Sequence, residues 1–263
     1  MPPKTKTNPF VLISGPCVLE SEAQALKIGR TVRDICRDIG WRYIFKASYD
    51  KANRTSIRSQ RGPGIDMGLA ILARIREKLD VPVLTDVHSV EEVHQASFFV
   101  DAVQIPAFLC RQTDLILAAG ESGVQVNVKK GQFLAPDDVD AIAEKLKSAG
   151  CRDYFITERG TSFGYHNLVV DMRGLAWMRE KGHRVIFDAT HSVQRPGSLG
   201  GATGGDGKLA PVLARAAVAA GVDGLFIETH PNPSRSPSDG PNMIPLAQMP
   251  SVLRQLAKIH EVI

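Results

Sequence analysis

Residues Tyr43–Ser56 read YIFKASYDKANRTS and change abruptly from an apolar run to a polar segment. The polar part supplies Lys46, Lys51, Asn53 and Arg54, together with several hydroxyl groups. Fixed positive charges beside amide and hydroxyl donors suit an anionic, hydroxylated small molecule, such as a sugar phosphate or an enol phosphate. A solvated basic loop is the ordinary alternative. We favour the ligand because the same event, an apolar strand that ends in charge, recurs along the whole chain.

Eight short apolar segments have the length of buried strands, and amphipathic helical patterns lie between most of them. The expected strands are Val11–Ile13, Tyr43–Phe45, Val81–Leu84, Ala102–Ile105, Val124–Val128, Tyr154–Thr157, Val185–Phe187 and Leu225–Ile227. Helical spacing is clearest in three sets of apolar residues: Ala25, Ile28, Val32 and Ile35; Val139, Ile142, Ala143 and Leu146; and Val252, Leu256, Ile259 and Ile263.

Many of the expected helices end on a glycine just before the next strand. These glycines are Gly40, Gly123, Gly150, Gly182 and Gly221. Glycine ends a helix at little cost because it accepts a positive φ. The order strand, polar loop, helix, glycine predicts a single-domain (β/α)8 TIM barrel over residues 1–263, with residues 1–9 as a flexible N-terminal segment. An open, doubly wound sheet is the alternative, because periodicity alone does not show that a sheet closes.

Composition narrows the class of protein. A chain of 263 residues that is 43% hydrophobic can bury a substantial core, and no apolar run approaches the ~20 residues of a membrane span. The start of the chain has lysines but no signal-peptide pattern, so we expect a cytoplasmic protein that is not bound to a membrane. The four cysteines lack CxxC spacing, which favours reduced thiols. The net charge of +4 is modest and the basic residues lie at strand ends, which favours anionic small molecules over nucleic acid.

In a barrel the carboxyl ends of all strands meet at one mouth, so polar residues that follow the strands become neighbours. In chain order they are Cys17, Lys46, Lys51, Asp86, His88, Gln104, Lys129, Lys130, Glu158, Arg159, Asp188, His191, Glu228 and His230. Ionisable or amide groups at strand after strand predict an active site. The cations among them, with Arg54, suffice for two phosphates and a carboxylate.

A second group combines a thiol, an imidazole and carboxylates, which suits one divalent transition metal. Its members are Cys17, His191, Glu228 and Asp239. Each also has an ordinary interpretation: a small buried residue, a hydrogen-bonded loop histidine, a salt-bridge partner and a turn residue, respectively. The glycine-rich segment Gly197–Gly207 lacks the GK[ST] of a nucleotide-binding loop, so we expect a mobile lid there instead.

Long, ordered motifs of the chain resemble those of 3-deoxy-D-manno-octulosonate 8-phosphate synthases. The motifs read ISGPC at 13–17, FKAS at 45–48, DKANR at 50–54, QIPAFLCRQTD at 104–114, VNVKK at 126–130, TERG at 157–160, DATHSVQ at 188–194 and ETHP at 228–231. The resemblance runs from about Val11 to the C-terminus. It implies a homotetrameric (β/α)8 barrel that condenses phosphoenolpyruvate with arabinose 5-phosphate and water, releases phosphate, and serves lipopolysaccharide biosynthesis.

The resemblance also implies roles for individual residues. Lys129 and Arg159 would bind the phosphoenolpyruvate phosphate, while Lys46, Lys51 and Gln104 would lie near its carboxylate and the sugar chain. Residues expected to bind arabinose 5-phosphate are Asn53, Arg54 and Thr55, with Arg111 acting in the adjacent subunit. Catalytic roles are expected for Lys46, Lys51, Asp86, His191 and Asp239.

The metal-dependent class of the family is implied by Cys17, because metal-independent members have asparagine there. The metal, bound by Cys17, His191, Glu228 and Asp239, would be zinc, iron, manganese or cobalt. One alternative is 3-deoxy-D-arabino-heptulosonate 7-phosphate synthase, which uses erythrose 4-phosphate, but its phosphate loop typically reads KPRT where this chain has KANRT at 51–55. The other is a non-catalytic sugar-phosphate-binding barrel, which would need the cations without the metal set.

Overall fold

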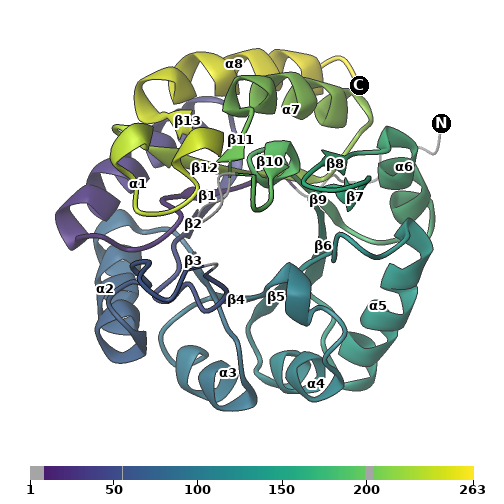
Figure 1. The fold of residues 1–263 in the computed structure, drawn as a ribbon, viewed down its shortest axis with the longest axis horizontal. Helices are drawn as coiled ribbons and strands as arrows, with labels where there is room; N and C mark the ends of the chain where they lie inside the picture. Colours follow the sequence, from purple (N-terminus) through teal and green to yellow (C-terminus); the bar gives the residue numbers. More distant parts are fainter. Residues whose placement is uncertain (1–8, 55, 199–203) are drawn as a thin grey trace.

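The computed structural model describes residues 9–54, 56–198 and 204–263 and shows a closed barrel of eight parallel strands (Figure 1). The barrel strands are β1 (Val11–Gly15), β2 (Arg42–Lys46), β3 (Val83–Asp86), β4 (Ala102–Ile105), β5 (Gln125–Lys129), β6 (Tyr154–Glu158), β9 (Val185–Asp188) and β12 (Gly224–His230). Each pairs with the next in chain order, and β1 pairs with β12, from Val11 opposite Gly224 to Gly15 opposite Glu228. All eight predicted strands are confirmed, and closure excludes the open sheet.

Within the described residues, eight α-helices surround these strands as an outer ring (Figure 1). They are α1 (Glu22–Asp38), α2 (Ile65–Leu79), α3 (Val90–Ala96), α4 (Thr113–Glu121), α5 (Val139–Ser148), α6 (Met172–Glu180), α7 (Ala210–Ala219) and α8 (Met249–His260). The predicted helical patterns fall on α1, α5 and α8. Ile263 is an exception: it lies beyond the end of α8, where the chain has left the helix, and is 39% exposed.

The remaining strands and helices are short and lie in the loops. Short strands are β7 (Thr161–Ser162), β8 (Leu168–Val169), β10 (Gln194–Arg195), β11 (Gly204–Gly205) and β13 (Ile244–Pro245). The 3-10 helices are η1 (Ala107–Leu109), η2 (Pro136–Asp138), η3 (His191–Val193), η4 (Gly207–Leu209), η5 (Pro233–Arg235), η6 (Gly240–Asn242) and η7 (Leu246–Gln248). β10 and β11 pair as an antiparallel ribbon directly after η3, which carries His191.

Alternating side chains of the strands divide the core into two parts. One large cluster fills the space between strands and helices, and a separate small cluster fills the barrel itself. The inner cluster consists of Val11, Ile13, Ile44, Leu84, Ala102, Phe155, Ile186 and Phe226. β5 contributes no residue to it, because the side chains alternating with its outward valines Val126 and Val128 are polar. The barrel therefore has an apolar floor and a polar upper layer.

Glycines meet two structural requirements in the barrel: several end helices on the side opposite the mouth, and one lets two strands approach closely. The helix-ending glycines Gly40, Gly123, Gly150, Gly182 and Gly221 all have φ between 70° and 86°, as predicted. Gly15 has a different function, because a Cβ there would lie 2.0 Å from the carbonyl oxygen of Lys46. Only glycine at the end of β1 lets β2 deliver Lys46 to the barrel axis.

Some of the residues predicted from the sequence to have a function are not described by the structure. Thr55, residues 1–8 and residues 199–203 of the expected lid lie outside the described residues. The four cysteines are buried, free thiols. No helix in the described part of the chain is long and apolar enough to cross a membrane.

Candidate active site

A chain of alternating charges crosses the barrel mouth. The Nζ of Lys46 donates a hydrogen bond to Glu228 Oε1 at 3.0 Å and lies 3.6 Å from Asp86 Oδ2, which in turn lies 3.8 Å from the Nζ of Lys51. Glu228 Oε2 lies 3.6 Å from the Nε2 of His191. The side chains of Lys46 and Glu228 are each 1% exposed. Charges this deeply buried are tolerated only when each has an opposite partner, because their desolvation costs free energy. A network of buried charges at the barrel mouth is therefore typical of a ligand-binding site.

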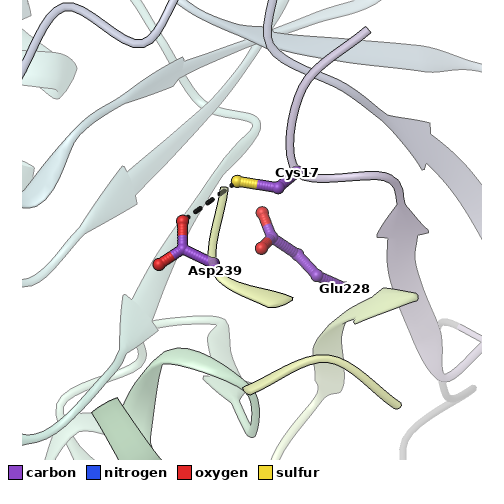
Figure 2. A group of neighbouring side chains, drawn as sticks. All are labelled: Cys17, Glu228 and Asp239. Carbon is purple, nitrogen blue, oxygen red and sulfur yellow. Dashed lines mark hydrogen bonds between the residues drawn. The ribbon is translucent and has the colours of Figure 1, made fainter. Parts of the chain in front are cut away.

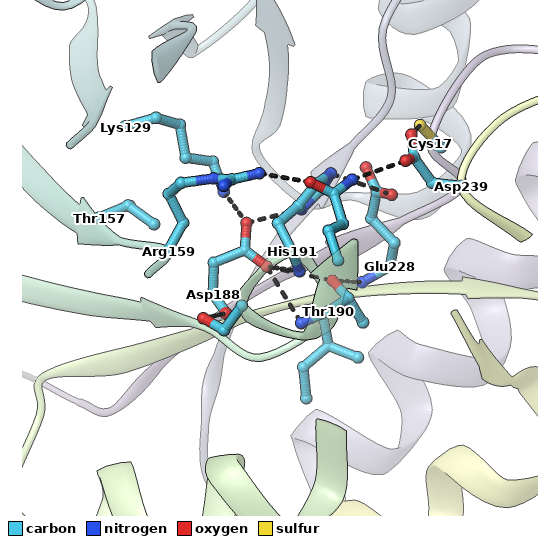
Figure 3. A network of polar contacts seen from close by, with 12 residues as sticks. Cys17, Lys129, Thr157, Arg159, Asp188, Thr190, His191, Glu228 and Asp239 are labelled. Atoms are coloured by element: carbon cyan, nitrogen blue, oxygen red, sulfur yellow. Dashed lines mark hydrogen bonds and ion pairs between the residues drawn. The ribbon is translucent and has the colours of Figure 1, made fainter. Parts of the chain in front are cut away.

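Asp188 continues this chain on the far side of His191 (Figure 3). Its Oδ2 accepts hydrogen bonds from His191 Nδ1, at 2.7 Å, and from the Nζ of Lys129. Its Oδ1 accepts from the backbone N–H groups of Thr190 and His191. The Asp188 contact holds Nδ1 of His191 and so directs the other ring nitrogen, Nε2, at Glu228.

A ladder of neutral groups completes the polar layer across β3, β4, β5 and β6. Gln104 donates to Asp86 Oδ1, Asn127 donates to Gln104 Oε1 at 2.7 Å, and Thr157 donates to Asn127 Oδ1 at 2.6 Å. Ser48 also donates to Asp86. Each amide has one oxygen and one NH2, so the ladder has one consistent direction that ends on the Asp86 carboxylate. Gln104 is therefore held in a fixed orientation at the mouth.

Arg159 stands beside Lys129 with part of its guanidinium unsatisfied (Figure 3). Its Nη2 donates to Gln194 Oε1, whereas its Nη1 is buried and has no hydrogen-bond partner in the part of the chain that the structure describes. A buried guanidinium N–H without an acceptor costs roughly 1–3 kcal/mol or more. An anion that reaches Nη1 would remove this cost.

Burial and neighbouring charges set the protonation of these groups. Burial opposes the charge on Lys46, but nearby anions, Asp86 foremost, raise its pKa overall. Burial lowers the pKa of Lys129 to about 8, with Asp188 opposing the shift. Burial also opposes ionisation of Asp86 and Asp188, yet their cationic neighbours hold both carboxyl pKa values well below the usual range. At neutral pH the carboxylates are ionised acceptors, and Lys129 is the cation closest to losing its proton.

Three of the four predicted metal ligands come together (Figure 2). One ligand atom from each of Cys17, Glu228 and Asp239 lies within 4.8 Å of the others. The Sγ of Cys17 donates to Asp239 Oδ2 at 3.1 Å. His191 is outside this compact group but directs Nε2 at Glu228 Oε2, which is buried and has no hydrogen-bond partner among the described residues.

The chemistry of this donor set fits a divalent cation. Burial, and then the charge of Glu228, raise the pKa of the Cys17 thiol well above its usual value. A cation among these groups would reverse that effect by stabilising the thiolate, as it does in thiolate metal sites. Asp239 has a φ of 54°, a left-handed conformation that is uncommon outside glycine and concentrates at functional sites.

Residues predicted to bind the sugar phosphate lie at the edge of the mouth or outside it. Asn53 is exposed. Arg54 donates from Nη1 to Ser238 Oγ at 2.8 Å, and Ser238 donates to Asp239 Oδ2 at 2.6 Å, so the loop after β2 is tied to the loop after β12. Arg111 is exposed, and its side chain makes no hydrogen bond or ion pair with the described mouth residues.

Several residues of the network were not assigned a function from the sequence. They are Asn127, Thr157, Gln194 and Ser238, whereas Asp188 was placed at the mouth without a specific role. The signal for Asn127 is present in the sequence, because a polar residue between two valines of a buried strand must face the barrel interior. The bridging position of Gln194 has no such signal, since it depends on how loops from different strands meet.

Comparison with known proteins agrees with this geometry. The model of the DAHP synthetase I family matches residues 4–263. The chain belongs to the DAHP synthetase I family. Among its curated relatives is the 2-dehydro-3-deoxyphosphooctonate aldolase of Granulibacter bethesdensis, 58% identical over 94% of this chain and 88% of the relative. Proteins of the same name from Acidithiobacillus ferrooxidans and Trichlorobacter lovleyi are 56% and 53% identical, each over 97% of this chain and over 91% and 93% of the relative.

Proposed function

We propose that the protein condenses phosphoenolpyruvate with D-arabinose 5-phosphate and water to give 3-deoxy-D-manno-octulosonate 8-phosphate and inorganic phosphate, the reaction of a 2-dehydro-3-deoxyphosphooctonate aldolase. Relatives of that name at 52–58% identity support this reaction. The structural observation that carries it is the buried pair Lys129 and Arg159, with Nη1 of Arg159 lacking an acceptor among the described residues. A phosphate monoester is the ligand that such a pair binds best.

The remaining cations suit the rest of the two substrates. Lys46 and Lys51, with the oriented amide of Gln104, serve the carboxylate of phosphoenolpyruvate and the sugar chain. Arg54 and Asn53, at the rim, serve the phosphate of arabinose 5-phosphate. Arg111 is exposed and, as the family resemblance implies, would act across the interface of a homotetramer.

The reaction joins C3 of phosphoenolpyruvate to the sugar aldehyde carbon, adds the oxygen of water at C2, and expels phosphate from C2. Negative charge develops on the aldehyde oxygen and positive charge develops transiently at C2. Lys46, whose pKa is raised, stays charged and stabilises the aldehyde oxygen. Asp86 and Asp239, whose pKa values are lowered, stay ionised and can stabilise positive charge.

One divalent transition metal per subunit is part of the proposal. Cys17, His191, Glu228 and Asp239 would hold it, and zinc, iron, manganese and cobalt all suit these ligands. Such a metal supplies a Lewis acid that polarises the aldehyde or orients the water. Asp188, by holding Nδ1 of His191, keeps Nε2 available as a ligand.

Two alternatives are weaker. The family name covers the seven-carbon synthase that uses erythrose 4-phosphate, but the relatives that we compared carry the eight-carbon name, and the loop at 51–55 reads KANRT and not KPRT. A non-catalytic binding barrel has no use for the metal-ligand group beside the phosphate cations. We expect the reaction to take place in the cytoplasm and to serve lipopolysaccharide biosynthesis.

A phosphate-release assay tests the proposed reaction. Purified protein with Mn²⁺, phosphoenolpyruvate and arabinose 5-phosphate should release one phosphate for each eight-carbon product detected by mass spectrometry. Omission of the sugar should abolish the release. Binding of both substrates without phosphate release would instead establish a binding protein.

A further inference from the structure

Gln194 is a buried residue at the start of β10 whose side chain joins two parts of the site. Its Oε1 accepts a hydrogen bond from Arg159 Nη2, and its Nε2 donates to Asp239 Oδ1 at 2.7 Å. Gln194 is 9% exposed and Arg159 is 6% exposed, so solvent does not replace either contact freely. A single amide therefore separates the phosphate-binding cation from a predicted metal ligand.

The amide of Gln194 supplies the two opposite functions that these contacts require, an acceptor and a donor. A guanidinium donates and never accepts, whereas an ionised carboxylate accepts and never donates. The group between Arg159 and Asp239 must then have an acceptor on one side and a donor on the other. Glutamate at position 194 would lose the donor, and methionine, of similar length, would lose both.

Each partner of Gln194 has a second group on its other side that faces the site. Arg159 has the buried Nη1, which lacks an acceptor in residues 9–54, 56–198 and 204–263. Asp239 directs Oδ2 toward Cys17 and Ser238. A ligand bound to Arg159 and a cation bound to Asp239 would therefore each affect the orientation of the Gln194 amide through one hydrogen bond.

We propose that Gln194 is a positioning residue that couples phosphoenolpyruvate binding at Arg159 to metal binding at Asp239. The inference rests on the proposed function. A ligand at either end orders the guanidinium, the amide and the carboxylate in one arrangement, so the second ligand meets a site that is already ordered. The coupling is positive and reciprocal: the metal tightens phosphoenolpyruvate binding by the same factor by which phosphoenolpyruvate tightens metal binding.

The chain provides a matched control at the other end of the barrel. Gln125, at the start of β5, is 7% exposed and also joins an arginine to an aspartate. Its Oε1 accepts from Arg42 Nη2 at 3.4 Å, and its Nε2 donates to Asp153 Oδ1 at 2.6 Å. Gln125→Met removes the same kind of bridge without touching the mouth.

The test measures binding by calorimetry, without arabinose 5-phosphate, so that no turnover occurs. Phosphoenolpyruvate is titrated into chelator-treated protein and into Mn²⁺-loaded protein. In the wild type the loaded form should bind about tenfold tighter, within the usual range of coupling. The ratio should fall to about threefold or less in Gln194→Met, the remainder being direct attraction, and should stay at the wild-type value in Gln125→Met. A ratio of about ten in Gln194→Met overturns the proposal.

Gln194→Glu gives a second, independent result. The new carboxylate pairs with Arg159 and adds negative charge beside Asp239, so phosphoenolpyruvate should bind about fivefold or more weakly while Mn²⁺ binds more tightly. Loss of packing alone would weaken both, and that outcome overturns the proposal even if Gln194→Met does not fold. A wild-type protein that binds phosphoenolpyruvate but no Mn²⁺ overturns the metal part of the proposed function, and this coupling with it.

Discussion

Raising the pH from 7 to 9 should weaken the capture of phosphoenolpyruvate through one residue, Lys129. Its Nζ pairs with Asp188 and lies 3.2 Å from the centroid of the Phe226 ring, and its side chain is 7% exposed. Burial lowers its pKa to about 8, although Asp188 opposes the shift. Because the charged form is the one proposed to bind the phosphate, the binding-competent fraction should fall as the pH rises through this value.

The size of the effect follows from that pKa. Lys129 is charged in about 0.9 of molecules at pH 7 and in about 0.1 at pH 9, so kcat/KM for phosphoenolpyruvate should fall about tenfold. Unfolding does not explain such a fall. Between its folded pKa of about 8 and its usual value of 10.5, Lys129 binds more protons in the unfolded chain, so its contribution to stability increases with pH.

The assay is steady-state phosphate release at limiting phosphoenolpyruvate, from pH 6.5 to 9.5, with Lys129→Arg as the matched variant. A guanidinium keeps its charge over this range, so the variant should show no fall near pH 8, whatever its absolute activity. A fall of the same size and midpoint in Lys129→Arg, or a flat wild-type profile, would refute the reasoning.

Substitutions at Arg159, Arg111 and Cys17 test other parts of the site. Arg159→Ala should raise KM for phosphoenolpyruvate by about 10- to 150-fold, because a charged phosphate contact contributes roughly 1.5–3 kcal/mol; an unchanged KM would place Arg159 outside the site. Arg111→Ala should weaken sugar-phosphate binding. If Arg111 acts across an interface, mixing Arg111→Ala subunits with Arg54→Ala subunits should restore activity. No recovery of activity on mixing argues against a shared site. Cys17→Ala should lose the metal and most of the activity, whereas Cys17→Asn should keep turnover that EDTA does not abolish. Wild-type protein that contains no metal, and is equally active with and without EDTA, would contradict the metal site.

The sequence predicted the barrel well because its signals are local. Each strand is a short apolar run, and each helix-ending glycine, such as Gly150 with a φ of 85°, marks where the chain must turn. Ile263 was assigned wrongly for the same reason. Its spacing continues the apolar face of α8, but the helix ends at His260 and Ile263 is 39% exposed.

The site was predicted in outline, because strand ends converge in any closed barrel. Lys46, Asp86, Lys129 and Glu228 meet at the mouth as expected. The sequence did not predict which of these groups pair with one another, since the pairs depend on how the barrel closes and how far each side chain extends.

The roles of Asp188 and Gln194 show this limit most clearly. Asp188 stands at a strand end in the sequence, yet only its contacts with Lys129 and His191 show that it serves both. Gln194 lies 45 positions before Asp239, and nothing in the intervening sequence indicates that the two side chains meet.

The most direct test of the central claim is the kcat/KM of the Mn²⁺-loaded protein for arabinose 5-phosphate and for erythrose 4-phosphate, with phosphoenolpyruvate saturating. The account predicts a strong preference for arabinose 5-phosphate and an eight-carbon product, because the loop at 51–54 places Asn53 before Arg54 at the rim of the mouth. Comparable values for the two sugars, or a preference for erythrose 4-phosphate, would contradict it and assign the chain to the seven-carbon synthases.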